Sequence, residues 1–225
     1  MEKQKIIDYL KEFASEERYN RIGEIAKKRT RHITVVIENL FQSHNMSAIL
    51  RTAECFGIQD VHIIERDFEY EISSQVALGA QKWLSIHRYN DTAGNNTVSC
   101  LKSLKEQGYK IIATSPHENN RLLDDISINS KSAFLFGTEL TGLTQEAVNM
   151  ADEFVKIPMY GFTESYNVSV SVALALMNIN ERLRKSTFDW SLSKEEILDL
   201  ELEWLKKSIK DSDRIVEKLH TCKHT

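Results

Sequence analysis

The sequence has few of the residues that break regular structure: two prolines and eight glycines among 225 residues. Hydrophobic residues make up 41% and charged residues 28% of the chain, proportions that are ordinary for a globular protein and exclude a disordered or fibrous one. The chain also lacks the run of about 20 apolar residues that a membrane-spanning helix needs. Residues 1–5 lead into an amphipathic, acid-containing pattern that is unlike a signal peptide. We therefore expect a cytoplasmic protein with no membrane partner.

Cysteine is also scarce, and its placement limits the kinds of site that are possible. The residues Cys55, Cys100 and Cys222 are dispersed and form no Cys-x-x-Cys pair. An odd, scattered set is typical of a reducing compartment and not of a disulfide framework. No histidine stands at ligand spacing from a cysteine, so we expect no metal site.

The net charge of −4 argues, by itself, against a nucleic-acid partner. The distribution of charge matters more than the total, however. The segment from Arg18 to Arg31 contains six basic residues and a single acid, Glu24. Charge alone leaves two interpretations open, a solvated helix face or a patch that neutralises RNA phosphates. The candidate RNA-binding residues are Arg18, Arg21, Lys27, Lys28, Arg29 and Arg31.

Hydrophobic runs and helical periodicity alternate along the chain. Two short helices are predicted in the first thirty residues, and a charged amphipathic helix from residue 193 onward. Strands are predicted at 33–37, 61–64, 83–87, 110–114, 132–136 and 153–157, and further helices at 47–56, 98–107, 144–150 and 167–184. This alternation predicts an α/β fold with a mostly parallel sheet covered by helices on both faces.

Three unusual polar segments, 38–53, 134–144 and 157–173, are predicted where strands end. Ligands of open α/β sheets gather at that edge. Each segment taken singly has a plain structural explanation: Arg51 extends along the surface of a packed helix, Thr144 caps a second helix, and Ser165 or Asn167 caps a third. The alternatives are an Arg51 aimed at an anion, a glycine turn that a ligand can approach, and an anion-binding helix start.

Taken together, the three segments resemble the three motifs of the SpoU (TrmH-like) branch of the SPOUT RNA methyltransferases. The patterns are His-Asn-x-Ser-Ala-Ile-x-Arg-Thr-Ala, Phe-Gly-x-Glu-x-x-Gly, and Ile-Pro-Met followed by Ser-x-Asn-Val-Ser-Val. They occur in the family's order and at similar spacings, and the resemblance runs from about Arg18 to Arg184. It is nearest to the subgroup that methylates a guanosine 2′-hydroxyl of tRNA, in which a basic amino-terminal helix precedes the first strand.

The resemblance implies an α/β domain at residues 32–186, with a deep trefoil knot over about 131–184. Residues 1–31 then form a basic helical extension, and residues 187–225 form a second helical extension. The family is homodimeric, with an active site drawn from both subunits. The apolar side of the last catalytic-domain helix, with Val170, Leu174 and Met177, is then either core or dimer seam.

The resemblance also implies a set of site residues and a cofactor, S-adenosylmethionine. The catalytic candidates are Arg51, Asn45, Glu139, Ser165 and Asn167. The cofactor-binding candidates are Thr114, Gly137, Ile157, Tyr166, Asn167 and Val168. Two positions depart from the family pattern: Tyr166, where most relatives carry Leu, and Leu140, where Lys is frequent.

The implied reaction is in-line transfer of a methyl group to a ribose 2′-hydroxyl of RNA. Arg51 is then either the base, helped by a substrate phosphate, or the stabiliser of the developing oxyanion; the second role suits a guanidinium better because it stays protonated. The subgroup resemblance and the patch from Arg18 to Arg31 favour guanosine 18 in the tRNA D-loop as the target. The alternatives are ribosomal RNA, or a non-catalytic RNA-binding protein that kept the knot. We expect no DNA partner.

Overall fold

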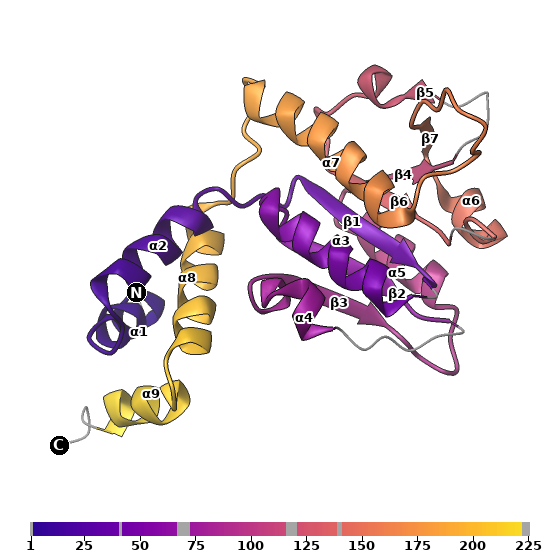
Figure 1. Cartoon of the computed structure of the whole chain (residues 1–225). Helices are drawn as coiled ribbons and strands as arrows, with labels where there is room; N and C mark the ends of the chain where they lie inside the picture. The colour runs from indigo at the N-terminus through magenta and orange to yellow at the C-terminus, as the bar shows by residue number, and fades with distance from the viewer. Residues whose placement is uncertain (1, 41, 67–72, 116–120, 139–140, 222–225) are drawn as a thin grey trace. The chain divides into compact units, whose positions relative to one another are not determined.

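The computed structural model describes residues 2–40, 42–66, 73–115, 121–138 and 141–221 (Figure 1). The chain divides into two compact units, Arg31–Trp190 and the pair Met1–Thr30 with Ser191–Thr225. The first unit contains the sheet, and the second is helical over its described residues. The two terminal segments therefore share one unit, while the domain boundaries near residues 31 and 186 stay a prediction.

The helical unit is built from amphipathic helices whose starts are capped by side chains. Its helices are α1 (Glu2–Lys11), α2 (Glu16–Ala26), α8 (Lys194–Ser208) and α9 (Ser212–Thr221). Ser15 caps α2, and Ser193 and Glu196 form a reciprocal capping box at the start of α8. α8 packs against α1 and α2.

The carboxy-terminal segment forms two helices, so the prediction of a single helix from residue 193 onward is wrong. α8 stops because Ile209 adopts an extended conformation and Asp211 a positive φ of 55°. The Ser212 hydroxyl then donates to the Lys206 carbonyl at 2.9 Å, which satisfies an acceptor that the end of the helix leaves open. Leu200 and Trp204 on α8 are buried, as the apolar side of an amphipathic helix should be.

The sheet unit begins with a strand that is buried on both faces. Its strands are β1 (Ile33–Glu38), β2 (Asp60–Ile64), β3 (Ser85–Tyr89), β4 (Lys110–Thr114), β5 (Arg121–Leu122), β6 (Ser132–Phe136) and β7 (Glu153–Lys156). Its helices are α3 (Ser43–Cys55), α4 (Ser74–Ala77), α5 (Asn96–Glu106), α6 (Gln145–Met150) and α7 (Val168–Lys185), with short 3₁₀ turns η1 (Ala80–Lys82) and η2 (Leu123–Asp125).

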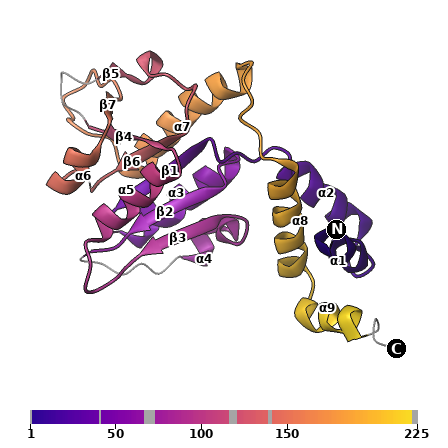
Figure 2. The ribbon, with the colours of Figure 1, turned by 180° about the vertical axis from the view of Figure 1, so that it is seen from behind.

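The described strands form a single parallel sheet in the order β3-β2-β1-β6-β4-β7-β5. α3 and α7 cover one face (Figure 1), while α5 and α6 cover the other (Figure 2). The predicted α/β architecture is thereby confirmed. The trefoil knot stays a prediction.

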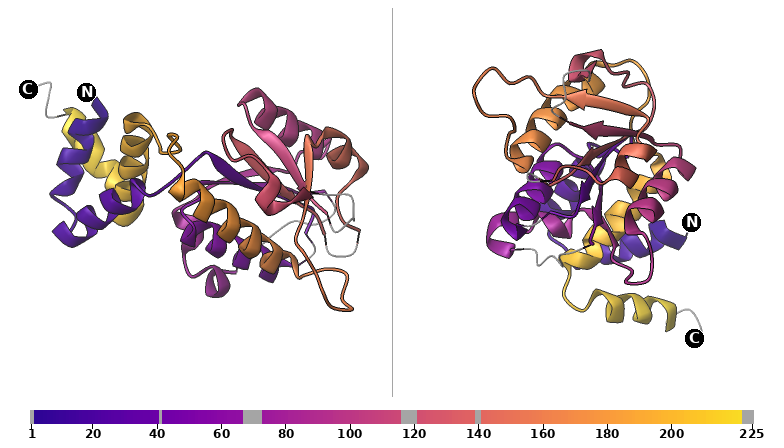
Figure 3. Two further views of the ribbon diagram at one scale, coloured as in Figure 1. Left: turned by 90° about the horizontal axis from the view of Figure 1, so that it is seen from above. Right: turned by 90° about the vertical axis from the view of Figure 1, so that its right-hand side faces the viewer.

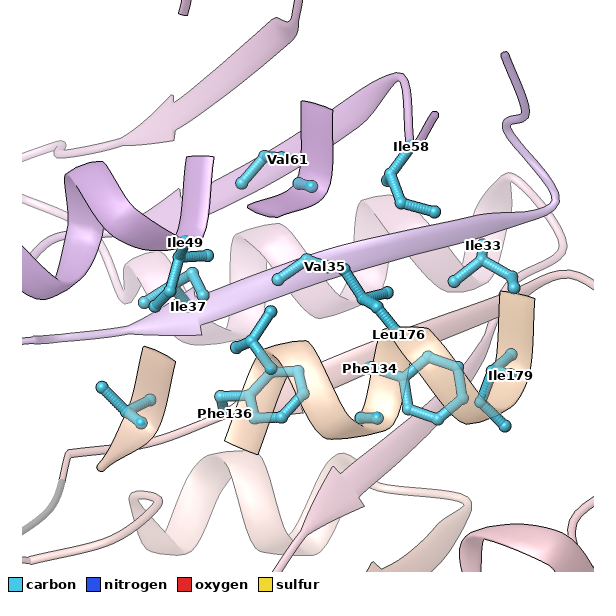
Figure 4. Packing of buried hydrophobic residues seen from close by; sticks show 14 of the residues in the cluster. Ile33, Val35, Ile37, Ile49, Ile58, Val61, Phe134, Phe136, Leu176 and Ile179 are labelled. Atoms are coloured by element: carbon cyan, nitrogen blue, oxygen red, sulfur yellow. The ribbon is translucent and has the colours of Figure 1, made fainter. Parts of the chain in front are cut away.

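Successive side chains of the central strands point to opposite faces of the sheet, so they enter two different hydrophobic cores. On β1, Val35 lies in register with Val61 of β2 and with Phe134 of β6, and all three point toward α3 and α7 (Figure 4). Val36 points to the opposite face, where it joins the core under α5 and α6. Full burial on both faces explains why these strands appear in the sequence as continuous apolar runs.

Most predicted elements are confirmed, and the main correction is at α3. This helix begins at Ser43 and not at residue 47, so Asn45 belongs to its first turn. Asn45 is only 4% exposed, because the helix start is packed into the unit. The short elements α4 and β5 have no clear pattern in the sequence, and neither was predicted.

A polar cluster joins β2 to the edge strand β3. The Arg31 Nε donates to Asp60 Oδ2 at 2.8 Å, and His87 Nε2 lies 2.9 Å from Asp60 Oδ1. Burial raises the pKa of Asp60, but the His87 hydrogen bond and the Arg31 charge outweigh it and leave this pKa below its ordinary value. The His62 ring is buried, stacks on His87 with centroids 4.5 Å apart, and has its Nδ1 3.3 Å from the Tyr89 hydroxyl.

Burial and the neighbouring His87 lower the pKa of His62 from 6.5 to about 4, so acid should destabilise the folded protein through this residue. Below pH 6.5 His62 becomes protonated in the unfolded chain but stays neutral in the folded one until about pH 4. This difference removes about 3 kcal/mol of the unfolding free energy by pH 4. His62→Phe should flatten the rise of the unfolding free energy between pH 4 and 6.5, measured by urea denaturation. The exposed His44→Gln should keep the wild-type slope. Equal slopes for His62→Phe and the wild type would contradict the assignment.

Candidate active site

The candidate site lies where the central strands end. β6 stands between β1 and β4, and β7 follows β4, so the segments after these strands meet at one edge. They enclose a cavity of about 590 Å³. The cavity is lined by Thr114, Ser115, Phe136, Gly137, Thr138, Thr141, Gly142, Leu143, Gln145, Val148, Phe154, Val155, Ile157, Met159, Glu164, Ser165, Tyr166, Val168 and Ser171. A cavity of this size and position suits a small-molecule ligand.

One wall of the cavity is a tight turn that only glycine can form. Thr138 and Gly142 pair through two backbone hydrogen bonds, of 3.2 and 3.0 Å, and Gly142 has a φ of 68°. A Cβ on Gly137 would lie 2.4 Å from the backbone carbon and oxygen of Gly142, too close for any side chain. The turn therefore presents backbone at the cavity wall, where a ligand can approach closely.

A buried carboxylate fixes the far side of this turn. Glu38, the last residue of β1, is 1% exposed. Its Oε1 accepts from the Thr97 hydroxyl at 2.6 Å and from the Thr144 hydroxyl at 2.7 Å, and its Oε2 accepts from the Thr144 N–H at 2.9 Å. Thr144 in turn caps α6. The carboxylate thus joins the end of β1 to the starts of α5 and α6.

A pair of asparagines joins the first and third motif segments. Asn167 Nδ2 donates to Asn45 Oδ1 at 3.1 Å, which links the first turn of α3 to the start of α7. The Asn167 Oδ1 accepts from the N–H and the hydroxyl of Ser169, at 2.9 and 2.6 Å, so Asn167 also caps α7. One side chain therefore serves as helix cap and as the link between two helices.

The predicted cofactor residues gather at the cavity. Thr114, Gly137, Ile157, Tyr166 and Val168 line it, and Asn167 lies between two lining residues. The Tyr166 hydroxyl donates to the Pro158 carbonyl at 3.2 Å, which closes the base of the loop between β7 and α7. The departure from the family's Leu at position 166 therefore supplies a loop-closing hydrogen bond.

The predicted catalytic residues are brought together only in part. Ser165 lines the cavity, and Asn45 and Asn167 are hydrogen-bonded to each other. Arg51 is exposed on α3, while the neighbouring residues Ile49 and Leu50 are buried. Glu139 lies outside the described residues.

The six basic candidates separate into two groups. Arg18, Arg21, Lys27 and Lys28 are exposed on or just after α2. Arg29 is 1% exposed, with its guanidinium carbon 5.2 Å from the centroid of the Trp204 ring, and Arg31 pairs with Asp60. Charge counting cannot distinguish a phosphate-binding arginine from one that is engaged in the fold.

The sequence alone did not assign a role to Glu38 or to several lining residues. Glu38 was recognised only as the first residue of a polar segment, although an acid directly after five buried strand residues was a usable signal. Phe154, Met159 and Glu164 line the cavity, and the sequence alone assigned none of them a role. Among the described residues, no group of three His, Cys, Asp or Glu side chains could hold a metal ion. None of the described helices is both long and apolar enough to span a membrane.

Comparison with known proteins agrees with this geometry. Residues 32–177 match the model of the SpoU rRNA Methylase family, and the chain belongs to that family. The tRNA (guanosine(18)-2′-O)-methyltransferase of Borreliella burgdorferi is 41% identical over 207 residues, covering 92% of this chain and 93% of that protein.

Two solved structures are similar in fold. The Aquifex aeolicus TrmH/SpoU tRNA-modifying enzyme is 28% identical, with a TM-score of 0.76 over 86% of this chain and 97% of that one. The SpoU methyltransferase AviRb from Streptomyces viridochromogenes, solved with the cofactor AdoMet, has a TM-score of 0.60 and 18% identity, over 70% of this chain and 63% of that one. The second likeness concerns the fold alone.

Gly137→Ala should destabilise the protein, because its Cβ must displace the backbone of the turn. We expect a loss of about 1–3 kcal/mol in unfolding free energy, measured by urea denaturation. Gly161→Ala is the matched control in the neighbouring loop, where the nearest atom to the added Cβ is Thr163 N at 4.0 Å. If the two variants were equally stable, the turn would not require glycine at position 137.

Proposed function

We propose that this protein transfers a methyl group from S-adenosylmethionine to the ribose 2′-hydroxyl of guanosine 18 in tRNA, the reaction named for the relative at 41% identity. The observation that carries the proposal is the cavity at the carboxyl edge of β4, β6 and β7. Most of its lining residues come from the second and third motif segments, and the third is hydrogen-bonded to the first through Asn167 and Asn45. We place the reaction in the cytoplasm, the compartment in which we expect this chain.

The residues at the cavity fit this cofactor. Its volume of about 590 Å³ is within the usual range for small-molecule sites. Phe136, Leu143 and Ile157 offer apolar walls for a flat heterocycle, while Ser115 and the backbone at Gly137 offer polar groups for the sugar and amino-acid portions. When bound, the cofactor supplies a methyl group activated by a sulfonium. Thr114, Gly137, Ile157, Tyr166, Asn167 and Val168 are the residues that we propose to hold it.

The catalytic work left to the protein is to position the hydroxyl and to stabilise the charge that develops on its oxygen. We assign the second task to Arg51, whose exposed guanidinium is free to meet an anion. Asn45 and Asn167 keep the starts of α3 and α7 together. Ser165 lies at the cavity wall, where its hydroxyl is available to the substrate. Glu139 completes the proposed set.

The direct test is incubation of the purified protein with labelled S-adenosylmethionine and unmodified tRNA or ribosomal RNA, followed by nucleoside mapping. The proposal predicts label in 2′-O-methylguanosine at position 18 of tRNA. Label in ribosomal RNA alone would overturn the substrate assignment. Tight RNA binding without transfer to either RNA would favour a non-catalytic binding protein.

Arg51→Ala should lower turnover by roughly 10²–10³-fold, because it removes the stabilising cation. Cofactor affinity, measured by calorimetry, should remain at the wild-type value. Arg51→Lys is the matched variant: it keeps the charge, so partial activity is expected, but it loses the planar fork of donors. If Arg51→Ala loses cofactor binding along with turnover, the residue has a structural role.

We further propose that the exposed residues Arg18, Arg21, Lys27 and Lys28 bind RNA phosphates. Their support is the concentration of positive charge on a chain whose net charge is −4. Arg29 and Arg31 are left out of this patch because they serve the fold.

The double substitution Lys27→Gln with Lys28→Gln removes two positive charges and should weaken RNA binding. The slope of log affinity against log salt should become shallower by roughly 0.7–0.9 for each phosphate contact that is lost. Binding curves at several salt concentrations give this slope. The exposed pair Lys102 and Lys105 on α5, changed to glutamine, is the control and should not alter it. An unchanged slope in the Lys27/Lys28 variant would make the patch a solvated helix face.

We also propose that the protein is a homodimer. Val170, Leu174 and Met177 follow one another at helical spacing on α7, and all three are exposed. Their exposure supports the dimer seam over the core, the two roles expected for this side of the helix. An exposed aliphatic stripe of this kind is typical of a surface that a second copy covers.

A further inference from the structure

The loop between β7 and α7 carries two aromatic side chains that contact almost nothing in the chain. Tyr160 is 97% and Phe162 is 109% exposed, and Gly161 separates them. The ends of the loop are joined by the hydrogen bond from Tyr166 to Pro158. The orange loop before α7 projects away from the sheet in both views of Figure 3.

The same loop forms part of the cavity wall. The cavity is lined by Met159, Glu164, Ser165 and Tyr166. Tyr160 and Phe162 lie between the first two of these in the sequence, and so belong to the same loop as the proposed cofactor site. Leaving two large aromatic side chains in water forgoes the stabilisation that their burial would bring. Within the described chain nothing covers these rings. A molecule that binds at the cavity would be placed to cover them.

We infer that Tyr160 and Phe162 form a stacking site for an unpaired nucleobase of the RNA substrate, beside the ribose that receives the methyl group. This inference rests on the proposed RNA methyltransferase function. Proteins recognise single-stranded RNA by stacking splayed bases on aromatic rings, and the flat faces of Tyr and Phe accept any base. The 2′-hydroxyl of a loop nucleotide can enter the cavity only when its surroundings are unstacked, which frees a base for these rings.

The composition of the loop distinguishes a base from other occupants. Residues 157–167 contain no lysine or arginine and one acid, Glu164, so this segment attracts no phosphate. Both rings belong to the loop that lines the cavity, so an RNA nucleotide whose ribose enters the cavity places a neighbouring base within reach of them. The stacking contribution should therefore be independent of salt, in contrast to that of the basic patch.

The test compares two double variants of the full chain in binding to unmodified tRNA at several salt concentrations. Tyr160→Leu with Phe162→Leu keeps apolar bulk but removes the rings, and should weaken binding roughly 10-fold or more with an unchanged salt slope. Tyr160→Phe with Phe162→Tyr keeps both rings and should bind like the wild type. Equal affinity of the leucine variant and the wild type would overturn the inference.

A spectroscopic readout locates the contact. Phe162→Trp places a fluorophore on the loop, and its emission should be quenched when a single-stranded RNA of the D-loop sequence binds; absence of quenching would count against stacking. Sedimentation tests the rival occupant: if the leucine variant dissociates into monomers, the rings belong to a contact between two copies, and the inference fails.

The outcomes also separate this inference from the proposed function. Methyl transfer by the wild type, together with normal tRNA binding by the leucine variant, would reject the stacking site alone. Absence of transfer by the wild type, with quenching and weakened binding still observed, would reject the methyltransferase proposal and leave the stacking site supported.

Discussion

The buried carboxylate of Glu38 is the interaction on which the arrangement of the site depends. A carboxylate removed from water is costly unless donors replace its hydration, and here two hydroxyls and one backbone N–H do so. Thr97 belongs to the first turn of α5 and Thr144 caps α6, so the end of the central strand anchors both helices on one face. Glu38 thereby also holds Thr144, which follows the cavity-lining residues Gly142 and Leu143.

On the opposite face of the sheet, covered by α3 and α7, a weaker interaction holds the two helices together. The hydrogen bond from Asn167 to Asn45 joins the starts of α3 and α7 beside the cavity. A neutral pair of this kind contributes about 1 kcal/mol, so its value lies more in geometry than in stability. Arg51, two turns further along α3 from Asn45, is held by the buried neighbours Ile49 and Leu50 while its guanidinium stays in solvent. Oxyanion stabilisation is strongest where water is excluded, so the role that we propose for Arg51 requires the bound RNA to cover its exposed side chain.

The sequence predicted much of the fold because burial leaves a simple pattern. The strands at 110–114 and 132–136 have the predicted bounds, since strands covered on both faces are unbroken apolar runs. α3 begins at Ser43, before the predicted residue 47, because polar residues such as Asn45 are packed into its first turn. Contacts between distant residues could not be predicted: Glu38 and Thr144 are 106 positions apart, and the engagement of Arg29 with Trp204 depends on a helix from the other end of the chain.

In our proposal, S-adenosylmethionine binds between the ends of β4, β6 and β7 and the start of α7. Hydrogen exchange of the full chain, with and without S-adenosylmethionine, tests it most directly. We expect slower amide exchange in residues 114–115, 136–144 and 155–168, with residues 18–31 unchanged. Protection confined to other segments, or no protection at saturating cofactor, would contradict it.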